Sequence, residues 1–325
     1  MKTSPYSDNH EGKPRKMGVE LEFSGLPIEQ ISDTIISLYG GKAKYQNNYK
    51  CSISGTKYDE FGPFKVELDA TLLKDEKLAG YLKRIGINPG KLANSIEETV
   101  ADSARHVVPM EIVTPPIPIK QLPELEEMRI ALQKQAVKDT RSSVFNAFGL
   151  HLNPEVPSLE PDSIRDFLRS FIIMYDWLKD KLRIDPSRRV TPYIDPFPRE
   201  YARLILKSDY EPDIETLIDD YLAYNPTRNR PLDMLPLFTF IDKDRVMNKI
   251  DDGLTTSRPT FHYRLPNCNI ADKNWRITDE WNYWVVVERV ASGKDRLADL
   301  SEKFLGSRSE QFIRQVSTRI KDILK

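Results

Sequence analysis

Alternation of polar and apolar residues in short segments is the feature that most constrains this chain, because side chains two apart in a strand share one face. In "MGVELEF" (residues 17–23), Glu20 and Glu22 alternate with apolar residues. Four further segments repeat the spacing: "FKVELDA" with Lys65, Glu67 and Asp69; "MEIV" with Glu111; "LHLN" with His151 and Asn153; and "FHYR" with His262 and Arg264. The pattern predicts a sheet with one apolar and one polar face.

The order of the remaining segments predicts the fold class. Helical spacing covers residues 27–41, 72–105, 118–136, 161–182, 278–291 and 307–324, with residues 185–260 irregular and partly helical. Turn signals at Asn47-Asn48 and Gly62-Pro63 indicate antiparallel hairpins. We therefore expect an α+β fold with an antiparallel sheet. Residues 1–16 are polar and predict a disordered leader, followed by a single domain over 17–325 whose part from about 278 to 325 is helical.

Charge and cysteine content exclude several classes of protein. Lys+Arg 48 and Asp+Glu 49 give a formal net charge of -1, which disfavours nucleic acid as a partner. No apolar run approaches the roughly 20 residues that span a bilayer, so we expect no membrane partner. The two cysteines, Cys51 and Cys268, have no CxxC spacing, which is compatible with a cytoplasmic location.

The gathered carboxylates suggest a chemistry. Carboxylates on one face repel one another and need a cation, and Mg²⁺ prefers carboxylate oxygens and brings nucleotide phosphates with it. Arg264 and Lys65 would suit those phosphates. The chain has neither GxxxxGK[ST] nor GxGxxG, so a glycine loop does not supply the phosphate site.

Each element also has an ordinary structural interpretation. A pair of acids on an alternating strand can lie on a solvated sheet face. His151 can be a core histidine bonded to backbone, and Arg264 can be half of an ion pair. Recurrence of the pattern in five segments favours a site over five independent solvated edges. We assign Trp275, Trp281 and Trp284 to core packing.

The segments "MGVELEF", "KVELDATL", "PMEIVTPP", "FGLHLN" and "PTFHYR" together, in this order, resemble the amidoligase family. This family is a branch of the carboxylate-amine ligase superfamily that contains glutamine synthetase and glutamate-cysteine ligase. The resemblance runs from about residue 17 to about residue 290. It implies a saddle-shaped or half-barrel antiparallel sheet with helices on its convex side. It also implies an enzyme that uses ATP and Mg²⁺ (or Mn²⁺) to join a small-molecule or peptide carboxylate to an amine through an acyl phosphate.

The resemblance also assigns roles to residues. The implied metal ligands are Glu20, Glu22, Glu67, Asp69, Glu111 and His151. The residues expected to contact the nucleotide are Glu20, Arg189 (or its neighbour Arg188) and Arg264, and those expected to act in catalysis are His151 and Arg264. We add Lys65 to both sets because of its charge and its place in the alternating pattern. The chain departs from the family pattern at Asn153, where a second histidine is usual, and at His262, where a glutamate is usual.

Two other functions compete with the ligase. A metal-dependent phosphohydrolase could use the same acids. A non-catalytic binding or structural protein could retain the sheet, and Asn153 and His262 motivate that alternative.

Overall fold

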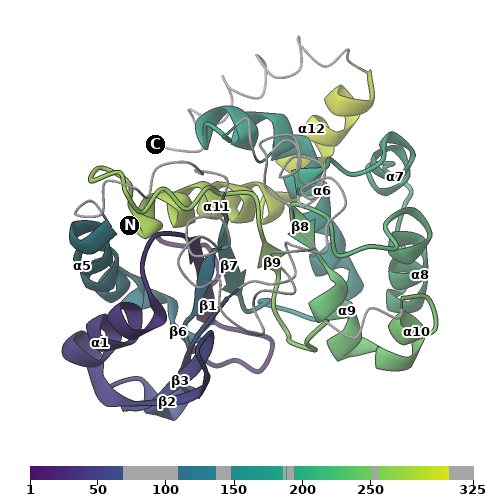
Figure 1. Ribbon diagram of the computed structural model, residues 1–325. Coiled ribbons are helices and arrows are strands. Elements are labelled where there is room, and N and C mark those ends of the chain that lie inside the picture. Colours follow the sequence, from purple (N-terminus) through teal and green to yellow (C-terminus); the bar gives the residue numbers. More distant parts are fainter. Residues whose placement is uncertain (69–108, 137–147, 186–187, 189–193, 251–254, 307–325) are drawn as a thin grey trace, which may run out of the picture.

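A nine-stranded antiparallel sheet organises the computed structural model (Figure 1). The structure describes residues 1–68, 109–136, 148–185, 188, 194–250 and 255–306. Within these residues the strand order is β2-β3-β4-β5-β1-β7-β9-β8, and β6 pairs with one end of β1. The strands are β1 (Lys16–Phe23), β2 (Gly40–Asn47), β3 (Lys50–Thr56), β4 (Phe64–Leu68), β5 (Met110–Val113), β6 (Ile117–Pro118), β7 (Leu150–Pro154), β8 (Leu232–Asp233) and β9 (His262–Tyr263).

The register separates apolar from polar side chains, as the alternation predicts. Leu21 of the central strand β1 lies opposite Ile112 of β5 and Leu150 of β7, and all three are fully buried. Glu20 and Glu22 alternate with these residues and belong to the other face. The α+β class and the antiparallel sheet are confirmed, whereas the saddle or half-barrel shape remains a prediction.

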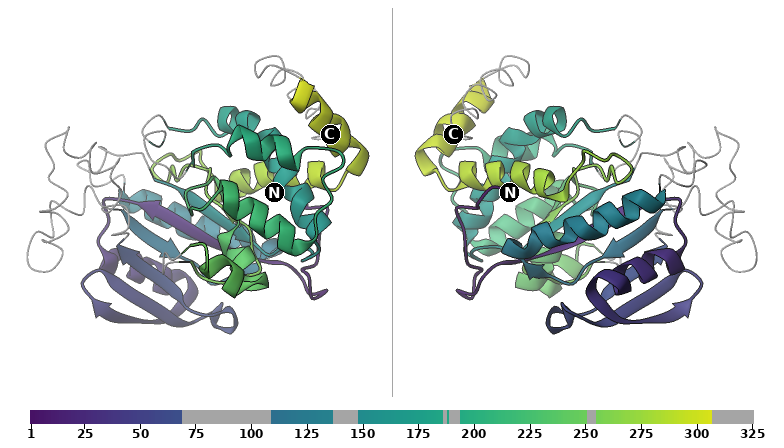
Figure 2. Two further views of the ribbon diagram at one scale, coloured as in Figure 1. Left: turned by 90° about the vertical axis from the view of Figure 1, so that its right-hand side faces the viewer. Right: turned by 90° about the vertical axis from the view of Figure 1, so that its left-hand side faces the viewer.

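The described part of the chain contains nine α-helices, some of which pack on the apolar face of the sheet. They are α1 (Ile28–Tyr39), α5 (Leu125–Ala136), α6 (Pro161–Lys181), α7 (Arg199–Ile205), α8 (Ile214–Tyr224), α9 (Leu235–Ile241), α10 (Lys243–Met247), α11 (Ile277–Ala291) and α12 (Lys294–Gly306), with 3-10 turns at Asp59–Phe61 and Ile119–Glu124. In the right panel of Figure 2, α5 and α1 lie over the strands. Helix α1 contacts β2, β3 and β4, which follow it directly in the chain.

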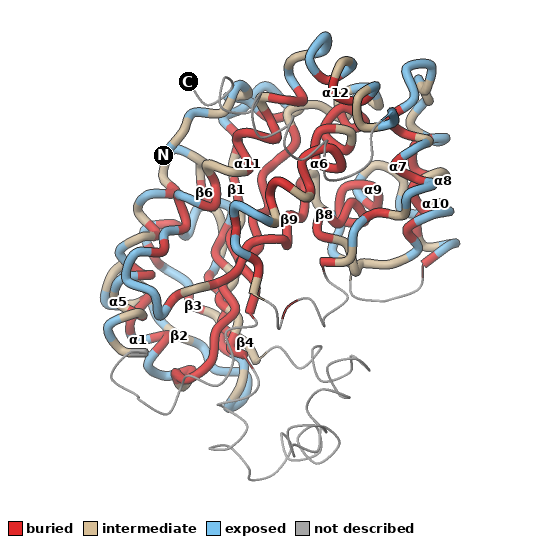
Figure 3. The backbone as a smooth tube through the Cα atoms, turned by 90° about the horizontal axis from the view of Figure 1, so that it is seen from above, coloured by how far each residue is buried: buried red, intermediate tan, exposed pale blue. Residues whose placement is uncertain are grey.

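Aromatic side chains join α6 and α11 to the sheet. Tyr263 of β9 lies 5.0 Å from Trp284 and 5.8 Å from Phe171, measured between ring centroids. Trp281 and Trp284 are fully buried and Trp275 nearly so, which confirms their assignment to the core. In Figure 3, buried segments run through β1, β9 and α6, while α8 and α10 expose their outer sides.

The N-terminal residues differ from the expected disordered leader, because a buried ion pair ties them to α11. Arg15 Nη2 lies 2.8 Å from Glu288 Oε1, and both side chains are almost inaccessible to solvent. Ser4 donates to the same carboxylate, and the Trp284 indole N–H donates to it over 2.8 Å. The partner of Arg15 stands 273 residues later in the chain, so the local polar composition of the leader could not reveal it.

In the C-terminal part, which we expect to be helical from about 278 to 325, one helix lies between the two segments with helical spacing. Helix α12 occupies Lys294–Gly306 and buries Leu297 and Leu300. The helices predicted at 72–105 and 307–324 lie outside the described residues. Among the described helices, none is both long and apolar enough to cross a membrane.

Candidate functional site

Two rows of mostly polar residues cross the sheet at its centre. In the first row, Glu20 of β1 lies opposite His151 of β7 on one side and Val113 of β5 on the other, and Val113 in turn lies opposite Lys65 of β4. In the second row, Glu22 lies opposite Glu111, which lies opposite Glu67. The register thus brings together on one face side chains from strands far apart in the sequence.

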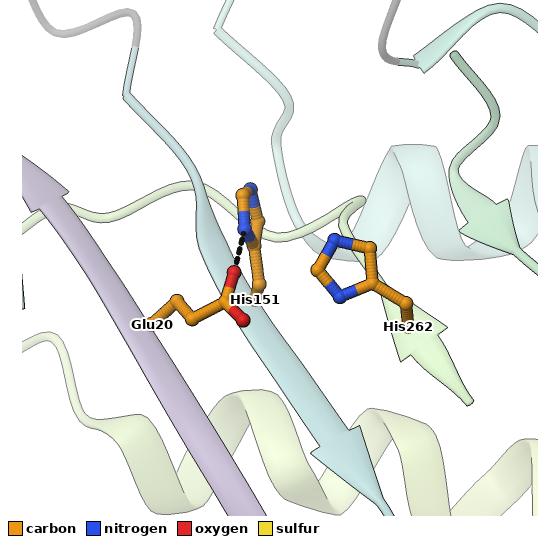
Figure 4. A group of neighbouring side chains, drawn as sticks. All are labelled: Glu20, His151 and His262. Carbon is orange, nitrogen blue, oxygen red and sulfur yellow. Dashed lines mark hydrogen bonds and ion pairs between the residues drawn. The ribbon is translucent and has the colours of Figure 1, made fainter. Parts of the chain in front are cut away.

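His151 lies between the two carboxylates of β1. Its Nδ1 is 2.7 Å from Glu20 Oε2, and its Nε2 is 3.2 Å from Glu22 Oε1. Figure 4 shows Glu20, His151 and His262 on neighbouring strands, on the same side of the sheet. A neutral imidazole carries one N–H and can donate to only one of these carboxylates. In the neutral form, one ring nitrogen therefore turns its lone pair toward a carboxylate, an arrangement that suits a bound cation.

Asn153 fixes the orientation of the second histidine. Its Nδ2 donates to Glu20 Oε1 over 2.9 Å, and because an ionised carboxylate only accepts, the amide oxygen must face the other way. That oxygen contacts His262 Nδ1. His262 Nδ1 therefore carries a hydrogen, and its Nε2 keeps the lone pair. The two imidazole rings meet edge to face, with centroids 5.1 Å apart.

The surroundings of Glu20 favour its charged form. Burial acts to raise the pKa of this carboxyl, but His262, His151 and Arg258 outweigh burial and hold the pKa well below its usual range. For His262, burial dominates and lowers the pKa of the imidazole well below its usual value, and Arg264 and His151 act in the same direction. Both directions favour a negative charge on Glu20 within this buried group.

Three arginines lie near these acidic and imidazole groups. Arg258 Nη1 lies 3.5 Å from Glu20 Oε1, and its side chain is one-third exposed. Arg264 is buried and donates to the carbonyl of Arg228. Arg188, the alternative to Arg189 in the sequence, donates to the carbonyls of Leu265, Pro266 and Arg264.

Arg188 therefore holds the backbone that follows β9. Complete burial lowers the pKa of its guanidinium to about 10, and Glu22 opposes that shift. At neutral pH the guanidinium remains charged. Its contacts with three successive carbonyls indicate that it positions Arg264.

Position 149, two residues before His151, has no room for a side chain and is occupied by a glycine. A Cβ at this position would lie 2.9 Å from His151 Nε2 and 3.2 Å from Glu22 Oε2. The backbone N–H of Gly149 also donates to Glu22 Oε2 over 2.8 Å. Only a residue without a side chain lets the strand approach this carboxylate so closely.

Within the described residues, two groups of side chains have the spacing of metal ligands. One is Glu20, His151 and His262, and the other is Glu22, Glu111 and His151. In each group, one potential ligand atom per residue lies within 4.8 Å of the others. The predicted ligands Glu20, Glu22, Glu111 and His151 therefore converge.

The remaining predicted residues lie at the margin or outside the described residues. Glu67 neighbours Glu111 in the register, but its carboxylate pairs with Lys50 at 2.6 Å. Lys65 is exposed and stands two strands from Glu20, about 10 Å away at the usual strand spacing. Asp69 and Arg189 lie outside the described residues.

Sequence reasoning missed two contributors to this site. Arg258 precedes the alternating segment "FHYR" and follows no strand pattern, so only its distance from Glu20 reveals it. Thr114 of the "VTPP" segment accepts a hydrogen bond from the Val19 N–H at 2.9 Å, next to Glu20. The prolines that follow Thr114 lack N–H groups and end the strand, a signal that could have marked Thr114 as a strand-ending side chain.

One comparison with known proteins gives a match. A family model described as "Putative amidoligase enzyme" matches residues 13–286, which cover β1, β5, β7 and β9. Neither the curated proteins nor the solved structures give a match. Since the family model covers most of the sequence, the chain belongs to this amidoligase family.

Proposed function

We propose that this protein is an ATP-dependent carboxylate-amine ligase that requires Mg²⁺. The observation that carries the proposal is the convergence of Glu20, Glu22, Glu111 and His151 on one face, in a chain of the amidoligase family. The proposed substrates are a small-molecule or peptide carboxylate and an amine.

The donor set fits a hard divalent cation. Glu22 and Glu111 offer oxygen ligands within 4.8 Å of each other and of a His151 nitrogen. Mg²⁺ takes few protein ligands and keeps waters and phosphate oxygens for its remaining positions. When bound, it would neutralise phosphate charge during transfer to the substrate carboxylate.

The arginines of the chain would complete the phosphate site. Arg258 is one-third exposed and close to Glu20, so its guanidinium could turn to a phosphate oxygen once a cation neutralises Glu20. Arg188 donates a hydrogen bond to the backbone carbonyl of Arg264 and so fixes its position. Arg264 would then stabilise the negative charge that develops on the phosphoryl group during transfer. Lys65 would reach the phosphates only at the outer edge of the site.

ADP formation tests the proposal. Purified protein is incubated with Mg-ATP, a panel of carboxylates and a panel of amines, and ADP is measured beside the amide product. We expect ADP to form only when both a carboxylate and an amine are present. The Glu22→Gln variant should form no ADP. Glu29→Gln, which changes an exposed glutamate of α1, serves as the matched control.

The alternative functions give different results. Phosphate release without any amine would identify a phosphohydrolase. Failure to bind ATP in calorimetry, together with no ADP from any substrate pair, would refute the ligase and leave a binding or structural protein.

A further inference from the structure

The two candidate metal groups differ in chemistry although they share His151. Glu20, His151 and His262 offer one carboxylate and two imidazoles, whereas Glu22 and Glu111 add only oxygen ligands. Imidazole nitrogen suits Zn²⁺ and other divalent transition metals, while carboxylate and water suit Mg²⁺. A pair of histidines and a carboxylate with open positions is a frequent ligand set of transition-metal centres.

His151 can serve only one group at a time. A neutral imidazole has a single lone pair, so a ring nitrogen that binds a cation leaves the other nitrogen as an N–H donor. If Nδ1 binds a cation beside Glu20, Nε2–H donates to Glu22, whose Oε1 already lies 3.2 Å away. A carboxylate that accepts from the distant nitrogen of a ligating histidine is a common support of metal sites.

Burial and orientation favour this assignment. His151 is 4%, His262 3% and Glu20 8% exposed, so water competes weakly for the ligand positions. The amide of Asn153 contacts both Glu20 and the His262 ring and thereby restrains two of the three ligands. Glu111, by contrast, is only half-buried.

We propose that Glu20, His151 and His262 form a site for a divalent transition-metal ion such as Zn²⁺, chemically distinct from the oxygen-rich Mg²⁺ position at Glu22 and Glu111. The inference rests on the proposed function for the identity of the Mg²⁺ position. Its own test needs neither ATP nor substrate, so the two can fail separately.

Metal affinity measured on untagged, metal-stripped protein tests the site. Zn²⁺ and Co²⁺ are titrated against a chromophoric chelator, and Mg²⁺ is titrated by calorimetry. We expect Zn²⁺ and Co²⁺ to bind at least about 10-fold more tightly than Mg²⁺. Equal affinities would overturn the proposal.

Histidine variants locate the ion. His262→Gln should weaken Co²⁺ and Zn²⁺ binding by at least about 10- to 100-fold, the usual cost of losing even a supporting residue. His10→Gln is the matched control, because His10 lies against Phe240 and outside both groups. His262→Glu replaces nitrogen by oxygen and should narrow the preference for Co²⁺ over Mg²⁺ by at least about 10-fold. Unchanged Co²⁺ affinity in a folded His262→Gln protein would refute the assignment.

One measurement needs no variant. The chain has four histidines, and labelling them with ¹⁵N lets nuclear magnetic resonance follow each ring. Addition of one equivalent of Zn²⁺ should move the ring nitrogens of two histidines by the large shift that direct ligation causes. A large shift of one ring only would instead place the ion at Glu22, Glu111 and His151, and would overturn the proposal even if both His262 variants failed to fold.

Discussion

Glu20 and Glu280 are equally buried, at 8% and 7% exposure, but their surroundings drive their charges in opposite directions. Glu20 lies on the polar face beside His262, His151 and Arg258, and its pKa is held well below the usual range despite burial. Glu280 lies on α11, the helix whose Trp284 packs against Tyr263. Burial there raises the pKa of Glu280 to about 8, opposed only in part by the indole N–H of Trp275.

The charged and hydrogen-bonding neighbours of a buried acid, rather than its depth of burial, therefore decide whether it is ionised. On the polar face, imidazole and guanidinium groups converge on the carboxylates. On the helical side, Glu280 Oε2 has no hydrogen-bond partner among the described residues, so the neutral acid is the stable form at pH 7. Four experiments test this contrast.

The largest effect is expected from Glu20→Gln. The variant keeps the shape of the side chain but removes the charge that meets His151 and Arg258. We expect ADP formation to fall by at least about 100-fold, equivalent to about 2.7 kcal/mol. Glu280→Gln should keep activity within a few-fold, because the native residue is already neutral. Comparable activity losses in the two variants would contradict the contrast.

Gly149→Ala should produce a smaller effect at the same site. The added Cβ would press against His151 Nε2 and Glu22 Oε2, which are buried and held by hydrogen bonds. We expect Zn²⁺ affinity to fall about 10- to 100-fold. Gly18→Ala is the control, since its Cβ would meet Asn153 at an ordinary 3.8 Å. Equal affinities of the two alanine variants would show that the approach at Gly149 does not position His151.

Glu280 predicts a pH dependence of stability. Its folded pKa of about 8 lies above its unfolded value near 4.5, so between these values the folded state holds the proton and the unfolded state does not. This group therefore lowers the free energy of unfolding as pH rises, by about 1.4 kcal/mol per pH unit, and the loss levels off above pH 8.

Urea unfolding of wild type and Glu280→Gln from pH 5 to 9 measures this contribution. The difference in stability should favour the variant increasingly up to about pH 8, since glutamine resembles the protonated acid and can accept from Trp275. A difference that stays constant with pH would show that Glu280 is ionised in the folded protein.

The sequence was sufficient to predict which polar side chains share a face of the sheet, because side chains two apart in a strand point the same way. Alternation placed Glu20, Glu22, Glu111 and His151 on one face, and the antiparallel register brought them together. It was insufficient where a partner lies far along the chain, as for Arg258 beside Glu20 and Arg15 beside Glu288. It also could not predict which side chains of the polar face are buried and which are exposed, because burial depends on the neighbouring strands and loops that cover each row.

The smallest effect on stability and metal affinity is expected from a substitution of Glu67. It follows the same alternation as Glu20, but it lies nearer the edge of the sheet and pairs with Lys50, whose side chain is nearly half exposed. Exposed ion pairs contribute at most about 1 kcal/mol, because solvent screens them. Glu67→Gln should therefore change the free energy of unfolding by less than about 1 kcal/mol and leave Zn²⁺ affinity unchanged. A large loss of Zn²⁺ affinity would mean that the metal site extends along the second row to β4. Alternation of polar residues alone, rather than burial beside imidazole and guanidinium groups, would then identify the ligands.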